Sequence, residues 1–176
     1  EDKVFLGVYV DDLAIAYSND DEHSLYQRFI SSLSSTWEIE DEGELSDLLG
    51  INFTRRGHAV ILDQTNYIEK MASTYFPDGV PPRVQATSVP ALVSLPQEIA
   101  DALTQSPEDV DPILTRRYQR IVGSLLYCAT NTRPDIAYSV GMLCRAMGKP
   151  TAELMTAAER VLAYLYRTRE LGLTYD

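Results

Sequence analysis

Two adjacent aspartates near the start of the chain are the residues best suited to chemistry. Asp11 and Asp12 separate two apolar runs, residues 4–10 and 13–17, with no glycine or proline at the junction. Both runs are rich in β-branched and aromatic residues, which predicts two buried strands joined by a tight turn that holds both carboxylates. Paired carboxylate oxygens at such a turn suit a hard cation such as Mg²⁺. An ordinary polar turn is the alternative, because aspartate bonds its own backbone in turns.

The elements that must position this pair follow directly in the sequence. The polar run Asn19-Asp20-Asp21 ends the second strand and is expected to cap a helix over residues 22–36. A short strand is expected at 37–40, and the acidic run 41–44 reads as a solvated loop. A further strand pair is expected, at 48–54 and 59–62. Gly50, inside the first of these strands, indicates a bulge or a close backbone approach.

The remainder of the chain reads as helices around a proline-rich interruption. Asn66 and Glu69 have the spacing of a capping box for a helix that ends before Phe76. Residues 77–112 hold seven prolines and predict a linker across the surface, with a short helix near 98–103. Three helices are expected over 113–172, the second capped by Thr132. Helical spacing predicts that Leu126 of the first faces inward, and that the third buries Leu154, Ala158, Val161, Leu162 and Leu165. Residues 173–176 begin a strand. The predicted fold class is α+β: a small antiparallel sheet with helices, followed by a three-helix region.

Composition places limits on the function. The net charge is −11, which argues against a free-standing nucleic-acid binder. The charge is uneven: residues 1–63 carry −10, residues 64–114 carry −5, and residues 115–176 carry +4. Cys128 and Cys144 lie in helical apolar patterns and are expected to be reduced, in an intracellular protein that is not secreted. No apolar run is long enough for a membrane span, and no membrane partner is expected.

The order of motifs resembles the reverse transcriptase of copia-type retrotransposons, from the palm hairpin to the edge of RNase H. Tyr9-Val10-Asp11-Asp12 is similar to the catalytic hairpin of that family. Leu48-Leu49-Gly50-Ile51 is similar to the strands that grip the primer end. The most specific matches are the runs Tyr118-Gln119-Arg120-Ile121-Val122-Gly123-Ser124-Leu125-Leu126-Tyr127 and Thr132-Arg133-Pro134-Asp135-Ile136-Ala137-Tyr138.

This resemblance assigns expected roles to particular residues. Asp11 and Asp12 are the expected catalytic residues and ligands of two Mg²⁺ ions about 3.5–4 Å apart, with Asp11 as the bridging ligand. Contact with nucleic acid is expected at Tyr9, Val10, Leu49, Gly50, Ile51, Arg116, Arg117 and Arg120. A plain core strand is the alternative for residues 49–51. Arg133 is a further candidate for contact with the template backbone. A solvated helix face is the alternative for these arginines. For Arg133, a structural pair with Asp135 that locks two helices is a second alternative.

The resemblance also implies a domain division. Residues 1–63 correspond to the C-terminal part of the palm, with the aspartate hairpin and primer-grip-like strands. Residues 64–76 correspond to a thumb-like helix, residues 77–112 to the proline-rich linker, and residues 113–172 to a connection-like helical region. Residues 173–176 correspond to the start of an uncompleted strand.

The family's third metal-binding aspartate and its fingers are expected upstream of the first residue, Glu1. On this interpretation the chain is a fragment of an RNA-directed DNA polymerase that is inactive alone and binds Mg²⁺ weakly or not at all. Its expected partners are an RNA/DNA template-primer and the fingers, palm and RNase H segments of the same polyprotein. The expected location is the cytoplasm, the nucleus or a virus-like particle. A domesticated or captured non-catalytic module for protein interaction or scaffolding is the alternative function.

Overall fold

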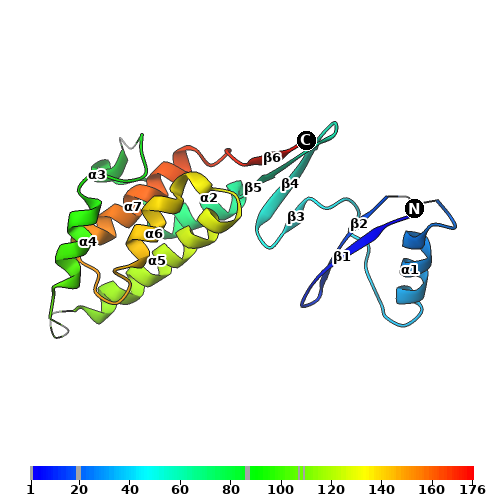
Figure 1. Ribbon diagram of the computed structural model, residues 1–176, viewed down its shortest axis with the longest axis horizontal. Coiled ribbons are helices and arrows are strands. Elements are labelled where there is room, and N and C mark those ends of the chain that lie inside the picture. The colour runs from blue at the N-terminus through cyan, green and yellow to red at the C-terminus, as the bar shows by residue number, and fades with distance from the viewer. Residues whose placement is uncertain (1, 19–20, 86–87, 107, 109) are drawn as a thin grey trace. The chain divides into compact units, whose positions relative to one another are not determined.

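The computed structural model describes residues 2–18, 21–85, 88–106, 108 and 110–176 (Figure 1). The chain divides into two compact units, Glu1–Leu45 and Ser46–Asp176. Both combine helices with antiparallel strands, so the predicted α+β class is confirmed. Among the described residues, every helix is too short or too polar to span a bilayer.

The first unit is a two-stranded hairpin and one helix. Strand β1 (Val4–Tyr9) pairs antiparallel with β2 (Asp12–Tyr17). Helix α1 (Leu25–Ser34) begins after Ser24, whose Oγ accepts a hydrogen bond from the Gln27 N–H, so the predicted start at residue 22 is wrong. Asn19 and Asp20, two residues of the predicted cap, lie outside the described residues.

The hairpin is not buried as the apolar runs predict. Phe5 and Val8 remain 66% and 64% exposed, and within the described part of this unit no apolar side chain is buried. Among the described strands, β1 and β2 pair only with each other. The Tyr17 ring stacks on Tyr26 of α1, with 3.9 Å between the ring centroids. The strand predicted at residues 37–40 is irregular instead, and none of the strands among the described residues pairs with it.

The second unit joins a four-stranded antiparallel sheet to a helical bundle, which lies beside one end of the sheet (Figure 1). The strand order is β3-β4-β5-β6. The strands are β3 (Asp47–Leu48), β4 (Ile51–Arg56), β5 (Ala59–Asp63) and β6 (Leu173–Tyr175). The strand predicted at 48–54 is therefore two strands, because Leu49 and Gly50 form a turn. The predicted strand at the end of the chain is confirmed, and it pairs with β5.

Six helices of this unit form or border the core. They are α2 (Thr65–Tyr75), α3 (Pro82–Gln85), α4 (Leu95–Leu103), α5 (Pro112–Asn131), α6 (Ala137–Cys144) and α7 (Ala152–Arg167). Helix α7 contacts α2, α3, α4, α5 and α6, so it is the centre of the bundle. The inward face predicted for α7 is confirmed, since Leu154, Ala158, Val161, Leu162 and Leu165 are all buried.

The proline-rich stretch is not a linker across the surface. It contains α3 and α4, and it contributes Val84, Leu95, Ile99 and Ala102 to the core. Its prolines mislead because Pro82 opens α3 and Pro96 lies in the first turn of α4, where a missing N–H costs no helical hydrogen bond. The predicted short helix is confirmed as α4, which begins at Leu95, three residues before the predicted start.

Two predicted caps and one predicted core position differ from the structure. Asn66 and Glu69 form no capping box; Asp63 instead accepts a hydrogen bond from the Thr65 N–H at 2.9 Å. Thr132 ends α5 and starts no helix, and its hydroxyl donates to the buried Gln64 side chain at 2.8 Å. Leu126, expected to face inward, is 40% exposed.

Candidate functional site

The aspartate hairpin closes through a two-residue turn made of Val10 and Asp11. Tyr9 pairs with Asp12 across the hairpin, so Asp12 is the first residue of β2. The prediction that both aspartates lie in the turn is therefore half right, since only Asp11 does. Tyr9 is 54% exposed, Val10 is 82% exposed, and both aspartates are exposed. The two carboxylates consequently lie in solvent at the turn end of the hairpin.

The backbone of this turn is strained. Val10 has a φ of 52°, in the left-handed region that β-branched residues avoid. Asp11 has a negative φ, so the two φ angles have the signs of a type II′ turn. That turn normally has glycine at the position of Val10. Among the described residues, Val10 and Leu49 alone are non-glycine positions with positive φ. Both belong to motifs for which the sequence predicted a function.

The donor set offered by the hairpin is chemically suited to Mg²⁺ but incomplete. Carboxylate oxygens are the ligands that Mg²⁺ prefers, and Asp11 and Asp12 supply them at adjacent positions. In the part of the chain that the structure describes, no group of three or more His, Cys, Asp or Glu side chains could hold a metal ion. Asp11 and Asp12 could therefore contribute part of a coordination shell whose remaining positions belong to water, substrate phosphates or a further carboxylate.

This geometry leads to a binding prediction. The isolated chain should bind Mg²⁺ no tighter than about millimolar, because Mg²⁺ keeps its waters and gains little from two solvated carboxylates. Titration calorimetry of the chain with MgCl₂ measures this directly. Micromolar affinity that is lost in Asp11→Asn but retained in the exposed control Glu38→Gln would contradict the prediction.

The second predicted contact lies in the turn between β3 and β4. Leu48 pairs with Ile51, which leaves Leu49 and Gly50 as the two turn residues, with φ of 56° and 75°. Two positive φ values are the pattern of a type I′ hairpin turn. Gly50 is therefore part of a turn and lies close to the Tyr67 ring, and it does not form a bulge. Leu49 is 44% exposed, so residues 49–51 are not a plain core strand.

The three candidate arginines on α5 differ in their surroundings. Arg117 forms an ion pair with Glu159 of α7 at 3.4 Å, and Arg83 of α3 contacts the other oxygen of the same carboxylate. Arg120 is exposed. Burial raises the pKa of the Tyr75 hydroxyl, although the positive charges of Arg120 and Arg117 act to lower it. Arg117 is therefore engaged in packing α3, α5 and α7 together.

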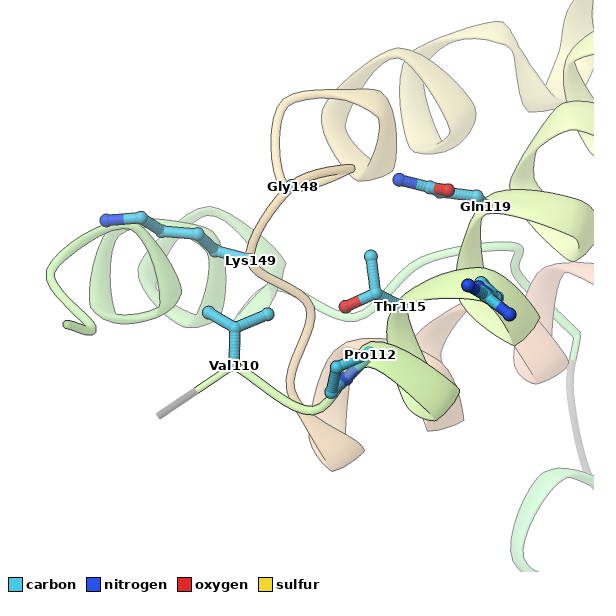
Figure 2. Close-up of a pocket in the computed structure, with 7 residues that line it drawn as sticks. Val110, Pro112, Thr115, Gln119, Gly148 and Lys149 are labelled. Carbon is cyan, nitrogen blue, oxygen red and sulfur yellow. The ribbon is translucent and has the colours of Figure 1, made fainter. Parts of the chain in front are cut away.

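Arg116 lines an open depression of about 440 Å³ near the start of α5 (Figure 2). The other lining residues are Val110, Pro112, Thr115, Gln119, Gly148 and Lys149. The Lys149 ammonium group donates to the carbonyl oxygens of Leu103 and Gln105, at 3.2 and 2.8 Å. It thereby stabilises the C-terminal end of α4, where unpaired carbonyls attract cations.

Arg133 and Asp135 form the structural pair that was the alternative to nucleic-acid contact. The Arg133 side chain is 1% exposed and donates to both Asp135 oxygens, at 2.9 and 2.7 Å. It also donates to the Thr168 carbonyl at 2.9 Å and hydroxyl at 2.6 Å, which ties the end of α5 to the end of α7. Burial acts to raise the pKa of Asp135, but hydrogen bonds from Arg133 and Tyr164 outweigh it and the pKa is lowered.

Glu159 is the residue of greatest structural consequence that sequence reasoning missed. Its side chain is 3% exposed on α7, between two arginines from other helices. The available signal was its spacing: it lies four residues after Met155 and three before Leu162, both buried on the same face. A carboxylate at a core position requires a cationic partner, and Arg83 and Arg117 meet that requirement.

Comparison with known proteins identifies homologues along nearly the whole chain. A Ty5-1 transposon protein of Saccharomyces cerevisiae is 33% identical over 173 residues, 98% of this chain and 52% of that protein. A mitochondrial protein of Arabidopsis thaliana is 31% identical over 97% of this chain and 64% of that protein. The retrovirus-related Pol polyprotein from transposon RE1 of Arabidopsis thaliana is 34% identical over 97% of this chain and 11% of its own length.

The chain thus spans about half of the Ty5-1 protein and about a tenth of the RE1 polyprotein. No protein-family model matches the chain. No solved structure matches it significantly. The motif order and these alignments agree, and the chain is a homologue of Ty5/copia-type transposon proteins and retrovirus-related Pol polyproteins over nearly its whole length.

Proposed function

We propose that the chain is part of an RNA-directed DNA polymerase, in which the Asp11–Asp12 hairpin takes part in nucleotidyl transfer. The observation that carries this proposal is the backbone strain. The described non-glycine residues with positive φ, Val10 and Leu49, lie in the two motifs that resemble the catalytic hairpin and the primer-gripping strands. Strain of this kind costs about 1–3 kcal/mol and concentrates at functional sites. The Pol polyprotein homologues support the same assignment and do not favour a non-catalytic interaction module.

The hairpin residues have distinct tasks in this reaction. The tight turn presents the Asp11 carboxylate at the tip, and Asp12 supplies a second carboxylate from the first position of β2. When bound, Mg²⁺ would activate the primer 3′-hydroxyl and stabilise charge on the triphosphate. Tyr9 and Val10, which are both exposed at the same end, would lie against the primer terminus. The exposed apolar faces of the hairpin suit packing against the rest of a polymerase palm.

Primer extension tests the proposal. A Pol polyprotein that carries this chain in place of its homologous segment should extend a DNA primer on an RNA template in the presence of Mg²⁺. Cooperative thermal unfolding and binding of the template-primer would establish that the chimera is folded. A folded chimera that binds the template-primer but adds no nucleotide would contradict a catalytic role for this segment.

A further inference from the structure

Two tyrosines from different helices contact the Leu49–Gly50 turn. The Tyr127 hydroxyl on α5 donates a hydrogen bond to the Leu49 carbonyl oxygen at 2.5 Å. The Tyr67 ring on α2 lies against Gly50, since a Cβ added there would be 3.5 Å from the ring. The two rings also contact each other edge to face, with 5.1 Å between their centroids. One turn is therefore fixed to both α2 and α5.

This support offsets an unfavourable backbone. Type I′ turns favour asparagine, aspartate or glycine at their first position, where this chain has leucine with a φ of 56°. A left-handed leucine costs about 1–2 kcal/mol relative to a right-handed one. The hydrogen bond from Tyr127 acts on the strained residue itself. A turn that served only to connect β3 and β4 would need neither the apolar side chain nor the anchor.

The outward side of the turn is available for contact. The Leu49 side chain is 44% exposed, although its carbonyl oxygen is engaged by Tyr127. A two-residue turn also leaves its backbone N–H groups outside the strand ladder, and backbone N–H groups are common donors to nucleic-acid phosphates. The turn therefore presents an apolar side chain next to hydrogen-bond donors.

A stripe on α5 continues from the turn. Arg120 and Gly123 precede Tyr127 by seven and four residues, so all three lie on one face of the helix. Arg120 lies about 10 Å from Tyr127 along the helix axis. A Cβ at Gly123 would meet no atom within 4 Å, which leaves the space between Arg120 and Tyr127 open. A guanidinium group, an open stretch of helix and the anchored turn thus follow one another along this surface.

We infer that Tyr127 and Tyr67 are positioning residues that hold the Leu49–Gly50 turn rigid for contact with the backbone of a primer strand. This inference rests on the proposed function and adds the two residues that fix the conformation of the turn. Tyr127 acts through the Leu49 carbonyl, and Tyr67 acts through Gly50. The Arg120–Gly123–Tyr127 stripe provides the path along which the strand approaches the turn.

The test uses the chimeric Pol polyprotein that carries this chain and a DNA primer annealed to an RNA template with a recessed 3′ end. Tyr127→Phe removes the anchoring hydrogen bond and keeps the ring, so affinity measured by fluorescence anisotropy at low salt should fall about fivefold. Amide hydrogen exchange at Gly50 should accelerate. Tyr138→Phe, at a site that is 66% exposed on α6, should change neither quantity. Tyr67→Leu, which removes the ring against Gly50, should weaken binding as Tyr127→Phe does.

A double-mutant cycle separates positioning from a general structural role. Leu49→Asn lets the turn adopt positive φ without help, so Tyr127→Phe should have little further effect on affinity in that background. Equal affinities of the unsubstituted chimera and its Tyr127→Phe variant would overturn this inference and leave the proposed function standing. Absence of template-primer binding by the folded, unsubstituted chimera would overturn the proposed nucleic-acid contact and, with it, the inference.

Discussion

Asp11→Asn should reduce primer extension by about 100-fold or more in a polymerase that carries this chain. The substitution keeps the size of the side chain and the turn but removes one negative charge and one metal-binding oxygen. Loss of a single group that stabilises transition-state charge commonly costs 100- to 1,000-fold in rate. Single-nucleotide incorporation under single-turnover conditions measures the chemical step. The template-primer affinity should change little, because the carboxylate acts through the metal.

The matched control for this prediction is Glu38→Gln. Glu38 is exposed in the same unit and lies outside the hairpin, so its substitution makes the same change in net charge. It should leave incorporation unchanged. Asp12→Asn should reduce the rate as Asp11→Asn does, since both aspartates are expected ligands. Equal rates for Asp11→Asn and the unsubstituted protein would exclude Asp11 as a metal ligand.

Asp135→Ala should destabilise the second unit by about 3 kcal/mol, because it leaves the buried Arg133 guanidinium without its anionic partner. Removing one partner of a buried ion pair costs about 3–5 kcal/mol. The lower end of this range applies because Asp135 is 35% exposed, so water can replace part of the lost carboxylate. The expected fall in melting temperature is roughly 6–12 °C. Urea unfolding followed by circular dichroism measures the free energy of unfolding.

Two comparisons make this stability prediction specific. Arg133→Met should cost less than Asp135→Ala, because it leaves a partly solvated carboxylate instead of a buried cation. The double variant should therefore be more stable than the sum of the two single effects predicts. Glu69→Ala is the control: Glu69 pairs with Arg169 at 2.8 Å, but the side chains are 48% and 32% exposed, and the expected loss is about 0–1 kcal/mol.

The pH dependence of stability follows from the lowered pKa of Asp135. Burial alone would raise this pKa, but the hydrogen bonds from Arg133 and Tyr164 bring it below its ordinary value. The stability that Asp135 contributes is therefore present above about pH 4, near the pKa of an unfolded aspartate, and is lost as the pH falls through the folded value. The difference in the free energy of unfolding between Asp135→Asn and the unsubstituted chain should therefore become smaller as the pH falls. A difference that stays constant down to pH 2 would contradict this account.

Local periodicity was sufficient for most secondary structure. The inward residues of α7 followed from their helical spacing, and the hairpin of β4 and β5 followed from two apolar runs around a glycine turn. Where prediction failed, local signals were ambiguous. Proline indicates both linkers and first turns of helices, so the sequence predicts a linker over residues 77–112, where the structure has two helices. Thr132 has the right chemistry for a helix start, but its hydroxyl is bonded to Gln64, 68 residues away in sequence.

The sequence by itself determined the Asp11–Asp12 hairpin, the amphipathic helices and the resemblance that the homologues support, because these depend on neighbouring residues and on motif order. Tertiary structure decided the rest. Only the packing of α5 against α7 shows that Arg133 is buried in a structural ion pair and that Arg117 pairs with the buried Glu159. Only the approach of α2 and α5 to the Leu49–Gly50 turn reveals its anchors. The physical reason is that a side chain's role depends on its partners, and Tyr127 and Leu49 are 78 residues apart in the chain.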